Sequence, residues 1–307
     1  MRLRRSITLD AAELAALVEE HVARLACTLR PDYLAALEAS LATEVSERGV
    51  EVLEQLLANA SLAATEGLPL CQDTGYVWVC VEASGDVRFA ADLFSQVDAA
   101  VARASKASGM RMSMVRDALL DRVNTQDNTP AFCELLLRRQ AEPGNTPAAP
   151  SEGDPACPVS TPAATLHIML KGGGSDNASA LALLPPGAGV NGVLDFVIEA
   201  VAAKGANACP PLVLGVGVGG SFDRVAGLAK HALLRTIGSI HPNPEIALLE
   251  EQLLTRVNEL GIGPGGLGGS TTALAVHIES APCHIAALPV AVNIGCTALR
   301  SVSISLF

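Results

Sequence analysis

Aromatic and charged residues are both scarce in this chain of 307 residues. Phe, Trp and Tyr make up only 3% of it and charged residues 17%, whereas 50% is hydrophobic. A core must therefore be built from Ala, Val, Leu and Ile, and the length suffices for one large domain or two smaller ones. Basic clusters are also missing beyond Arg2 to Arg5, and the formal net charge is −11. This acidic balance argues against a nucleic acid as partner.

The chain also lacks the features of a leader peptide and of a membrane span. Asp10 and Glu13 follow the basic residues 2–5 where a secretory signal would have an apolar stretch, and a mitochondrial presequence would be poor in acids. No window of eighteen residues is free of charge, glycine and proline together, so we expect no contact with a membrane. Eight cysteines without a secretory signal indicate reduced thiols. We therefore expect a cytoplasmic protein.

The hydrophobic pattern predicts a helical N-terminal region followed by interleaved strands and helices. Asp10 with Glu13 suggests a capping box for the first helix, and Pro31 suits the first turn of the second. Further helices are predicted at about 50–59, 90–107, 112–123, 192–204, 223–235 and 244–260. Strands are predicted at 75–81, 132–137, 165–170, 212–218, 272–278 and 285–292, the last two closing the chain. The fold class is therefore α/β (mixed α+β), without the strict alternation of a Rossmann domain.

Residues 141–164 interrupt this pattern. The stretch holds six prolines and two glycines among small polar residues, which is typical of an exposed loop. Because strand-like segments flank it at 132–137 and 165–170, we interpret it as a surface insertion between two adjacent strands rather than as a linker between domains. The expected organisation is one domain spanning 1–307.

Three of the eight cysteines stand in contexts unsuited to disulfides. Cys71, Cys209 and Cys296 each lie where an apolar segment meets a turn marked by Gly or Pro. Three thiolates without a regular CxxC spacing could hold three irons of a cubane cluster and leave the fourth iron open as a Lewis acid. Beside a carboxylate such as Asp73, an open iron suggests hydration or dehydration chemistry. The other five cysteines are expected to be ordinary small hydrophobes.

Two glycine-rich motifs allow both structural and functional interpretations. Residues 171–177, KGGGSDN, resemble an anion-binding nest, although a plain turn is the commoner case. Gly215, Gly217 and Gly220 match the dinucleotide fingerprint formally. No second parallel strand with an acidic residue at its end follows at the required distance, which argues against NAD.

Single polar residues are equally ambiguous when each is taken alone. Arg111 is either a surface residue or a bidentate ligand for a substrate carboxylate. His284 is either a core histidine or a neutral donor to a substrate anion. A hydrolase that uses Cys283 with His284 is the weakest alternative, because adjacent residues of a strand point to opposite faces.

Taken together, the motifs resemble the α (N-terminal) part of the oxygen-sensitive iron–sulfur fumarases and the related tartrate dehydratases. The resemblance runs from the first helices to Arg300. It is carried by CQDTG at 71–75, Arg111 with the NTxDNTP region at 124–130, KGGGSDN at 171–177, NACPP at 207–211, HPNP at 241–244, GIGPGGLGG at 261–269 and HIAALPVAVNIGC at 284–296.

The resemblance implies that 1–307 is a catalytic domain forming half of an active site, with a [4Fe–4S] cluster and a small dicarboxylate as its ligands. By motif position, Cys71, Cys209 and Cys296 ligate the cluster, whose fourth iron binds the substrate. Asp73 is the acid/base residue, with Gln72 beside it. Arg111, the backbone N–H of Gly173 and His284 hold the substrate carboxylates.

The sequence departs from the family pattern in three places. Gln126 stands where members commonly have Gly, the insertion at 141–164 is unusual, and the region that follows in single-chain members is absent. We therefore expect the α subunit of an α2β2 heteromer, completed by a β subunit. The form of KGGGSDN favours hydration of fumarate to malate, with L(+)-tartrate dehydratase or mesaconate hydratase as alternatives. A redox protein without chemistry of its own is disfavoured, because it would need a fourth cluster ligand.

Overall fold

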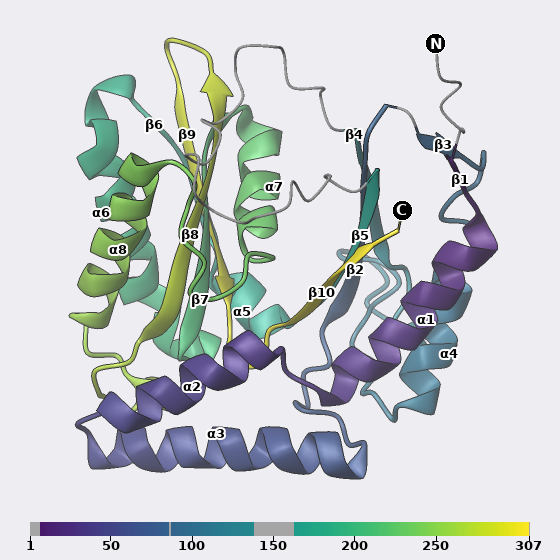
Figure 1. Cartoon of the computed structure of the whole chain (residues 1–307), viewed down its shortest axis with the longest axis horizontal. Helices are drawn as coiled ribbons and strands as arrows, with labels where there is room; N and C mark the ends of the chain where they lie inside the picture. The colour runs from purple at the N-terminus through teal and green to yellow at the C-terminus, as the bar shows by residue number, and fades with distance from the viewer. Residues whose placement is uncertain (1–6, 86, 138–162, 307) are drawn as a thin grey trace, which may run out of the picture. The chain divides into compact units, whose positions relative to one another are not determined.

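The computed structural model describes residues 7–85, 87–137 and 163–306, and the chain divides into two compact units (Figure 1). Unit 1 comprises residues 1–26, 76–170 and 301–307, and unit 2 comprises residues 27–75 and 171–300. Each unit is thus assembled from segments that are far apart in the sequence. The assignment of one catalytic domain to 1–307 stays a prediction.

Unit 1 is built around a four-stranded sheet of order β10-β5-β2-β4. Its strands are β2 (Tyr76–Ala83), β4 (Phe132–Leu137), β5 (Ala164–Lys171) and β10 (Arg300–Ser305), although Lys171 and Arg300 belong to unit 2. The helices are α1 (Ala11–Cys27) and α4 (Val97–Ala107), and two short strands, β1 (Ile7–Leu9) and β3 (Val87–Phe89), pair in parallel. The core joins Val79 of β2 and Ile168 of β5 to Val18 of α1 and Val101 of α4. Burial of β2 and β5 on both faces explains their nearly continuous apolar sequence.

Unit 2 contains the second four-stranded sheet, of order β6-β9-β7-β8. Its strands are β6 (Ala180–Leu184), β7 (Leu212–Gly220), β8 (Ala273–Cys283) and β9 (Leu288–Gly295). β7 pairs in parallel with β8 and antiparallel with β9, which pairs antiparallel with β6. The helices are α2 (Pro31–Thr43), α3 (Glu47–Glu66), α5 (Gly173–Ala178), α6 (Gly189–Lys204), α7 (Phe222–Ala232) and α8 (Pro244–Asn258), with short 3₁₀ turns η1 (Pro186–Ala188), η2 (Gly205–Ala208) and η3 (Pro264–Gly266).

The two faces of this sheet receive different helices (Figure 1). Alternate residues of β7, such as Leu214, pack with Val197 of α6 and Leu253 of α8. On the other face, a Cβ at Gly215 would lie 2.1 Å from the carbonyl oxygen of Ala229, and one at Gly217 would meet α7 equally closely. The glycines that resemble a dinucleotide fingerprint thus let helix α7 approach the strand.

The sequence places most elements correctly but errs in three places. The helix predicted at about 112–123 is absent: the Asp117 carboxylate accepts the N–H groups of Leu119 and Leu120 at 2.8 and 2.5 Å, which makes a turn, and these leucines are 82% and 89% exposed. The strands before and after the Pro-rich loop are not adjacent, because β2 lies between β4 and β5. β8 and β9 do not close the chain, since β10 follows them. The loop predicted at 141–164 lies outside the described residues except for its last two.

One continuous helical segment, residues 186–208, is long and apolar enough to cross a membrane by length and composition alone. Core helices of soluble proteins pass the same test. Within this segment, α6 buries Val193, Leu194, Val197 and Val201. The expectation that the chain has no contact with a membrane stays a prediction.

Candidate active site

Three separate segments of unit 2 bring cysteines to one cavity of about 280 Å³. Cys71 lies just before β2, Cys209 directly after η2, and Cys296 directly after β9. The lining also includes Asp73, Gly172, Gly174, Ser175, Ala208 and Thr297. The cysteines that the sequence singled out, which are up to 225 positions apart in the printed sequence, therefore surround a common space.

Asp73 is positioned by the segment that begins at Lys171. Its Oδ1 accepts the N–H of Gly75 at 3.1 Å, and its Oδ2 would lie 3.3 Å from a Cβ at Gly172. Gly75 itself has a φ of 78°, and a Cβ there would lie 2.6 Å from the carbonyl oxygen of Lys171. Only glycine fits this close backbone approach, which joins the CQDTG and KGGGSDN motifs. Residues 173–178 of the second motif form the short helix α5.

The backbones around Cys209 and Cys296 are braced against each other. The N–H of Thr297 donates to the carbonyl oxygen of Cys209 at 3.0 Å, and the Tyr33 hydroxyl donates to that of Cys296 at 2.8 Å. Cys209 has a φ of 55°, in the left-handed region. For a residue with a Cβ this conformation costs about 1–2 kcal/mol, and such strain is concentrated at functional sites.

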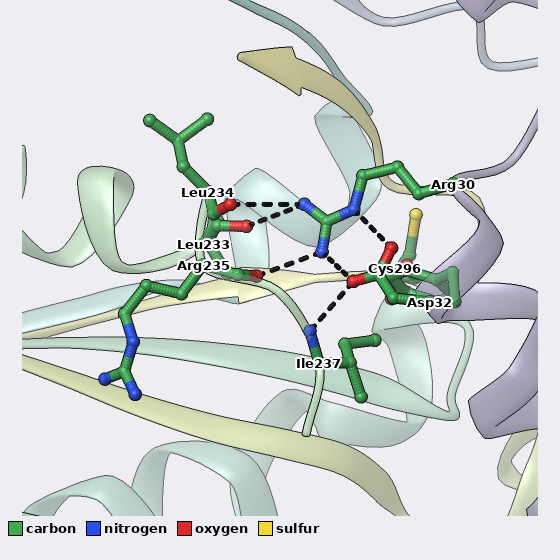
Figure 2. A network of polar contacts seen from close by, with 8 residues as sticks. Arg30, Asp32, Leu233, Leu234, Arg235, Ile237 and Cys296 are labelled. Carbon is green, nitrogen blue, oxygen red and sulfur yellow. Dashed lines mark hydrogen bonds and ion pairs between the residues drawn. The ribbon is translucent and has the colours of Figure 1, made fainter. Parts of the chain in front are cut away.

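The start of α2, which carries Tyr33, is itself fixed to the end of α7 (Figure 2). The Arg30 guanidinium pairs with Asp32 at 2.5 Å and donates to the carbonyl oxygen of Arg235 at 3.0 Å. It also reaches those of Leu233 and Leu234, each at 3.5 Å. A cation at the C-terminal carbonyls of a helix satisfies acceptors that the helix leaves unpaired. Figure 2 shows Cys296 beside this network.

Two buried cations belong to the same part of unit 2 as the cysteines. Lys171 Nζ donates to Ser175 Oγ at 3.0 Å and to the Ile294 carbonyl oxygen at 2.7 Å, and lies 3.4 Å from Asp176 Oδ1. Burial lowers the pKa of Lys171, whereas the negative charges of Asp176 and Cys296 act to raise it. Burial also lowers the pKa of Arg300, opposed by Cys296, Cys71 and Asp73.

The Cys209 thiol responds to burial and to the same anionic groups. The residue as a whole is exposed, but partial burial of its thiol raises its pKa, and charges on Cys296, Cys71 and Asp73 raise it further. An opposite charge nearby is needed to keep closely spaced thiols ionised. Lys171 supplies such a charge for Cys296, and Arg300 supplies one for Cys296 and Cys71.

The residues around the cavity fit an iron–sulfur group. Three thiols supply the sulfur ligands that iron prefers, and the described lining offers no fourth cysteine and no histidine. Within the described part of the chain, the buried Thr297 Oγ1 and Arg300 Nη1 have no hydrogen-bond partner. Of these two, Thr297 lines the cavity, and an unsatisfied donor there is suited to an anionic, sulfur-rich group.

The other predicted site residues do not line this cavity. Gln72 is exposed in its turn, and Gly173 begins α5, where its Cβ would lie 3.9 Å from Asp73 Oδ2. His284 is exposed in the β8–β9 connection and lines a second, apolar cavity of about 540 Å³ in unit 2. Its Nδ1 accepts the Ala286 N–H at 3.1 Å, whereas Cys283 Sγ donates to the Ala287 carbonyl oxygen at 3.2 Å.

Arg111 lies in unit 1, exposed on the irregular segment after α4. Its carbonyl oxygen accepts the side-chain N–H of Asn128 at 3.1 Å, and Asn128 Oδ1 accepts the Ser113 N–H at 2.6 Å. The polar turn around Asn128 therefore orders the segment that carries Arg111. Gln126, in the same turn, has a φ of 67°, which explains why Gly suits this position.

Sequence reasoning missed Tyr33, Thr297 and Arg300 and treated Lys171 only as part of a motif. A charged residue inside an apolar run, such as Arg300, is the one feature that could have drawn attention, because such residues are seldom buried without a partner. The roles assigned to the predicted site residues stay predictions.

Comparison with known proteins identifies the family. A family model described as "Fumarate hydratase (Fumerase)" matches residues 15–305. A protein of Methanocaldococcus jannaschii named "Putative L(+)-tartrate dehydratase subunit alpha" is 36% identical over 274 residues, 89% of this chain and 90% of that protein. The "L(+)-tartrate dehydratase subunit alpha" of Escherichia coli strain UTI89 is 33% identical over 94% of this chain and 89% of its own, and that of strain K12 is 32% identical.

These relatives are named as alpha subunits. The predicted resemblance is thereby confirmed over nearly the whole chain. The chain belongs to the fumarate hydratase (fumerase) family, whose members are hydro-lyases.

Proposed function

We propose that this chain is the α subunit of a [4Fe–4S] hydro-lyase that hydrates fumarate reversibly to (S)-malate. In this proposal a β subunit completes the site in an α2β2 heteromer. The observation that carries the proposal is the cavity of unit 2 lined by Cys71, Cys209, Cys296 and Asp73. The three cysteines would hold the cluster, which when bound supplies a Lewis acid at an iron without a protein ligand.

Asp73 acts as the acid/base group in this scheme. The N–H of Gly75 donates to Oδ1, which leaves Oδ2 for proton transfer. In hydration Oδ2 takes a proton from the attacking water, and in dehydration it returns that proton to the leaving hydroxyl group. A Cβ at residue 172 would lie 3.3 Å from Oδ2, so Gly172 leaves free the space that the carboxylate occupies. Gln72, next in sequence, assists in orienting the substrate.

The substrate is held by its carboxylates. Arg111 supplies a planar guanidinium that can bind one carboxylate through two parallel hydrogen bonds. His284 and the backbone N–H of Gly173 supply further donors. Because both ends of the substrate are then fixed, the proton transfer becomes effectively intramolecular.

Dehydration of L(+)-tartrate is the second candidate, and the names of the relatives favour it. The KGGGSDN form of residues 171–177 favours fumarate instead. Mesaconate differs from fumarate by one methyl group, which changes binding by only about 1–3 kcal/mol, so it is a candidate side substrate.

The test is to coexpress the chain with its β partner, purify the complex anaerobically and compare kcat/KM for fumarate, L(+)-tartrate and mesaconate. The highest value for fumarate supports the proposal, whereas a higher value for L(+)-tartrate replaces it with the second candidate. Asp73→Asn should lower kcat by about 10²–10⁴-fold while retaining iron. Full activity of the isolated chain would contradict the two-subunit organisation.

Iron and acid-labile sulfide analysis tests the cluster independently of turnover. We expect about four of each per chain after anaerobic reconstitution, falling sharply in Cys209→Ala. Cys27→Ala, which removes a thiol outside the described cavity lining, is the matched control and should keep its iron. A cluster that cycles reversibly between redox states without any hydratase turnover would favour the redox-protein alternative.

A further inference from the structure

Arg300 is a buried arginine that the proposed chemistry does not use. It is only 1% exposed, and its Nε donates to the carbonyl oxygen of Ala298 at 2.9 Å. Its Nη2 donates to the carbonyl oxygens of Asp73 at 3.0 Å and Thr74 at 3.4 Å. Its third nitrogen, Nη1, is buried without a partner among the described residues. One side of the guanidinium is therefore satisfied by backbone and the other is left open.

Burying the Arg300 guanidinium destabilises the fold unless a nearby anion compensates for the lost hydration. Removing a guanidinium from water costs several kcal/mol, by the general behaviour of buried ions. Among the described residues, no carboxylate lies within ion-pair distance of Arg300, whereas buried Lys171 has Asp176 at 3.4 Å. The anionic groups that favour its charged form are Cys296, Cys71 and Asp73.

We propose that Arg300 is the buried counter-charge of the Cys71 and Cys296 thiolates and the positioning residue for the turn that carries Cys71 and Asp73. This inference rests on the proposed cluster site. The guanidinium holds the turn in place by hydrogen bonds to the carbonyl oxygens of Asp73 and Thr74. Its positive charge, with the unpaired Nη1 donor, offsets the negative charge of a thiolate-ligated group. Arg, unlike Lys, supplies both functions at once, because its donors form a rigid fork.

The two functions can be separated by substitution. Arg300→Lys keeps the charge but has no fork, whereas Arg300→Gln and Arg300→Met remove the charge. In full-length chains reconstituted anaerobically with iron and sulfide, the neutral variants should release iron to excess EDTA about tenfold faster than wild type, as for other residues that support metal ligands. Their cluster reduction potential should fall, because a cation favours the more negative, reduced state.

Arg300→Lys should retain iron and the reduction potential nearly as well as wild type. With the β partner its kcat should fall, because the Asp73 turn is held less firmly. Arg256→Met, which removes an exposed arginine paired with Asp195 at 2.8 Å on the same unit, is the matched control and should match wild type in all three measurements.

Each outcome has a distinct meaning. Wild type without iron would overturn the proposed function rather than this inference alone. Wild type with iron, and neutral variants that hold it as firmly at an unchanged potential, would overturn the role of Arg300. Circular dichroism will show whether Arg300→Met folds. If it does not, the rates of iron release from Arg300→Gln and Arg300→Lys test the counter-charge. Equal iron release from these two would refute the counter-charge.

Discussion

The Asp73 carboxylate lies directly against Gly172: a Cβ at residue 172 would sit 3.3 Å from Asp73 Oδ2. This separation is tighter than most contacts of a real Cβ, so a methyl group there would force the carboxylate aside by a few tenths of an ångström. The position of the proposed acid/base group thus depends on the absence of a side chain in a motif far from it in sequence.

Gly172→Ala should therefore lower kcat about tenfold, since displacement of a reacting group by up to 1 Å costs up to about 10²-fold. Iron content should stay near wild type, because no cysteine is touched. Gly227→Ala, where a Cβ meets nothing within 4 Å, is the control and should leave kcat unchanged. An unaltered kcat in Gly172→Ala would argue against Asp73 as the acid/base residue.

Glu44, in the turn between α2 and α3, forms hydrogen bonds to the end of the glycine-rich loop that precedes β8. Its Oε1 accepts the N–H groups of Ser46 at 3.1 Å and Ser270 at 2.8 Å, and its Oε2 accepts that of Thr271 at 3.0 Å. Burial alone would raise the pKa of Glu44, but the hydrogen bonds from Ser270, Ser46 and Thr271 lower it from 4.5 to about 2. The charged form is thus stabilised by folding.

Glu44→Gln should reduce the free energy of unfolding at pH 7 by on the order of 2 kcal/mol. Because the folded pKa is depressed, this contribution is complete above pH 4.5 and is lost as the pH falls toward 2. Urea unfolding of wild type and variant at pH 7 and pH 3 should show the difference shrinking at the lower pH. Glu54→Gln, on the exposed face of α3, is the control. A difference independent of pH would contradict this account.

Gln126 adopts a left-handed conformation, with φ at 67°, where a side chain is unfavourable. Gln126→Gly should therefore raise the free energy of unfolding by about 1 kcal/mol, and Gln126→Ala should not. Thermal unfolding of both variants checks this. A lower stability of Gln126→Gly would show that the Gln side chain makes a stabilising contact.

The elements that the sequence predicted well are those with long apolar patterns bounded by turns. The continuous Val-rich run correctly predicted that β2 is a strand. Pro31 correctly predicted where helix α2 begins. The helix at 112–123 failed because its apolar spacing has no partner: Leu119 and Leu120 are exposed, and the Asp117 side chain ends the turn. Strand order failed because neighbours along the chain need not be neighbours in a sheet.

For the site, chemistry was readable where residue types are specific. Cysteine and aspartate beside turns marked by Gly or Pro singled out Cys71, Asp73, Cys209 and Cys296, which line one cavity, and their roles stay predictions. Supporting contacts were not readable, because they join distant positions through the backbone. Arg300, for example, binds the Asp73 carbonyl oxygen 227 positions away, and a carbonyl carries no sequence information.

Tyr33 supports the last of the three cysteines from the start of α2. It is 1% exposed, and its hydroxyl donates to the Cys296 carbonyl oxygen at 2.8 Å. Tyr33→Phe should cost about 1 kcal/mol, or about 2–4 °C in Tm, because it leaves a carbonyl without its donor. Iron should also be released faster, since the Cys296 backbone is freed. Ser40→Ala, which removes a hydroxyl bonded at 2.8 Å within the same helix, should change Tm without changing iron release. If both variants release iron equally fast, the Tyr33 contact is not what holds Cys296.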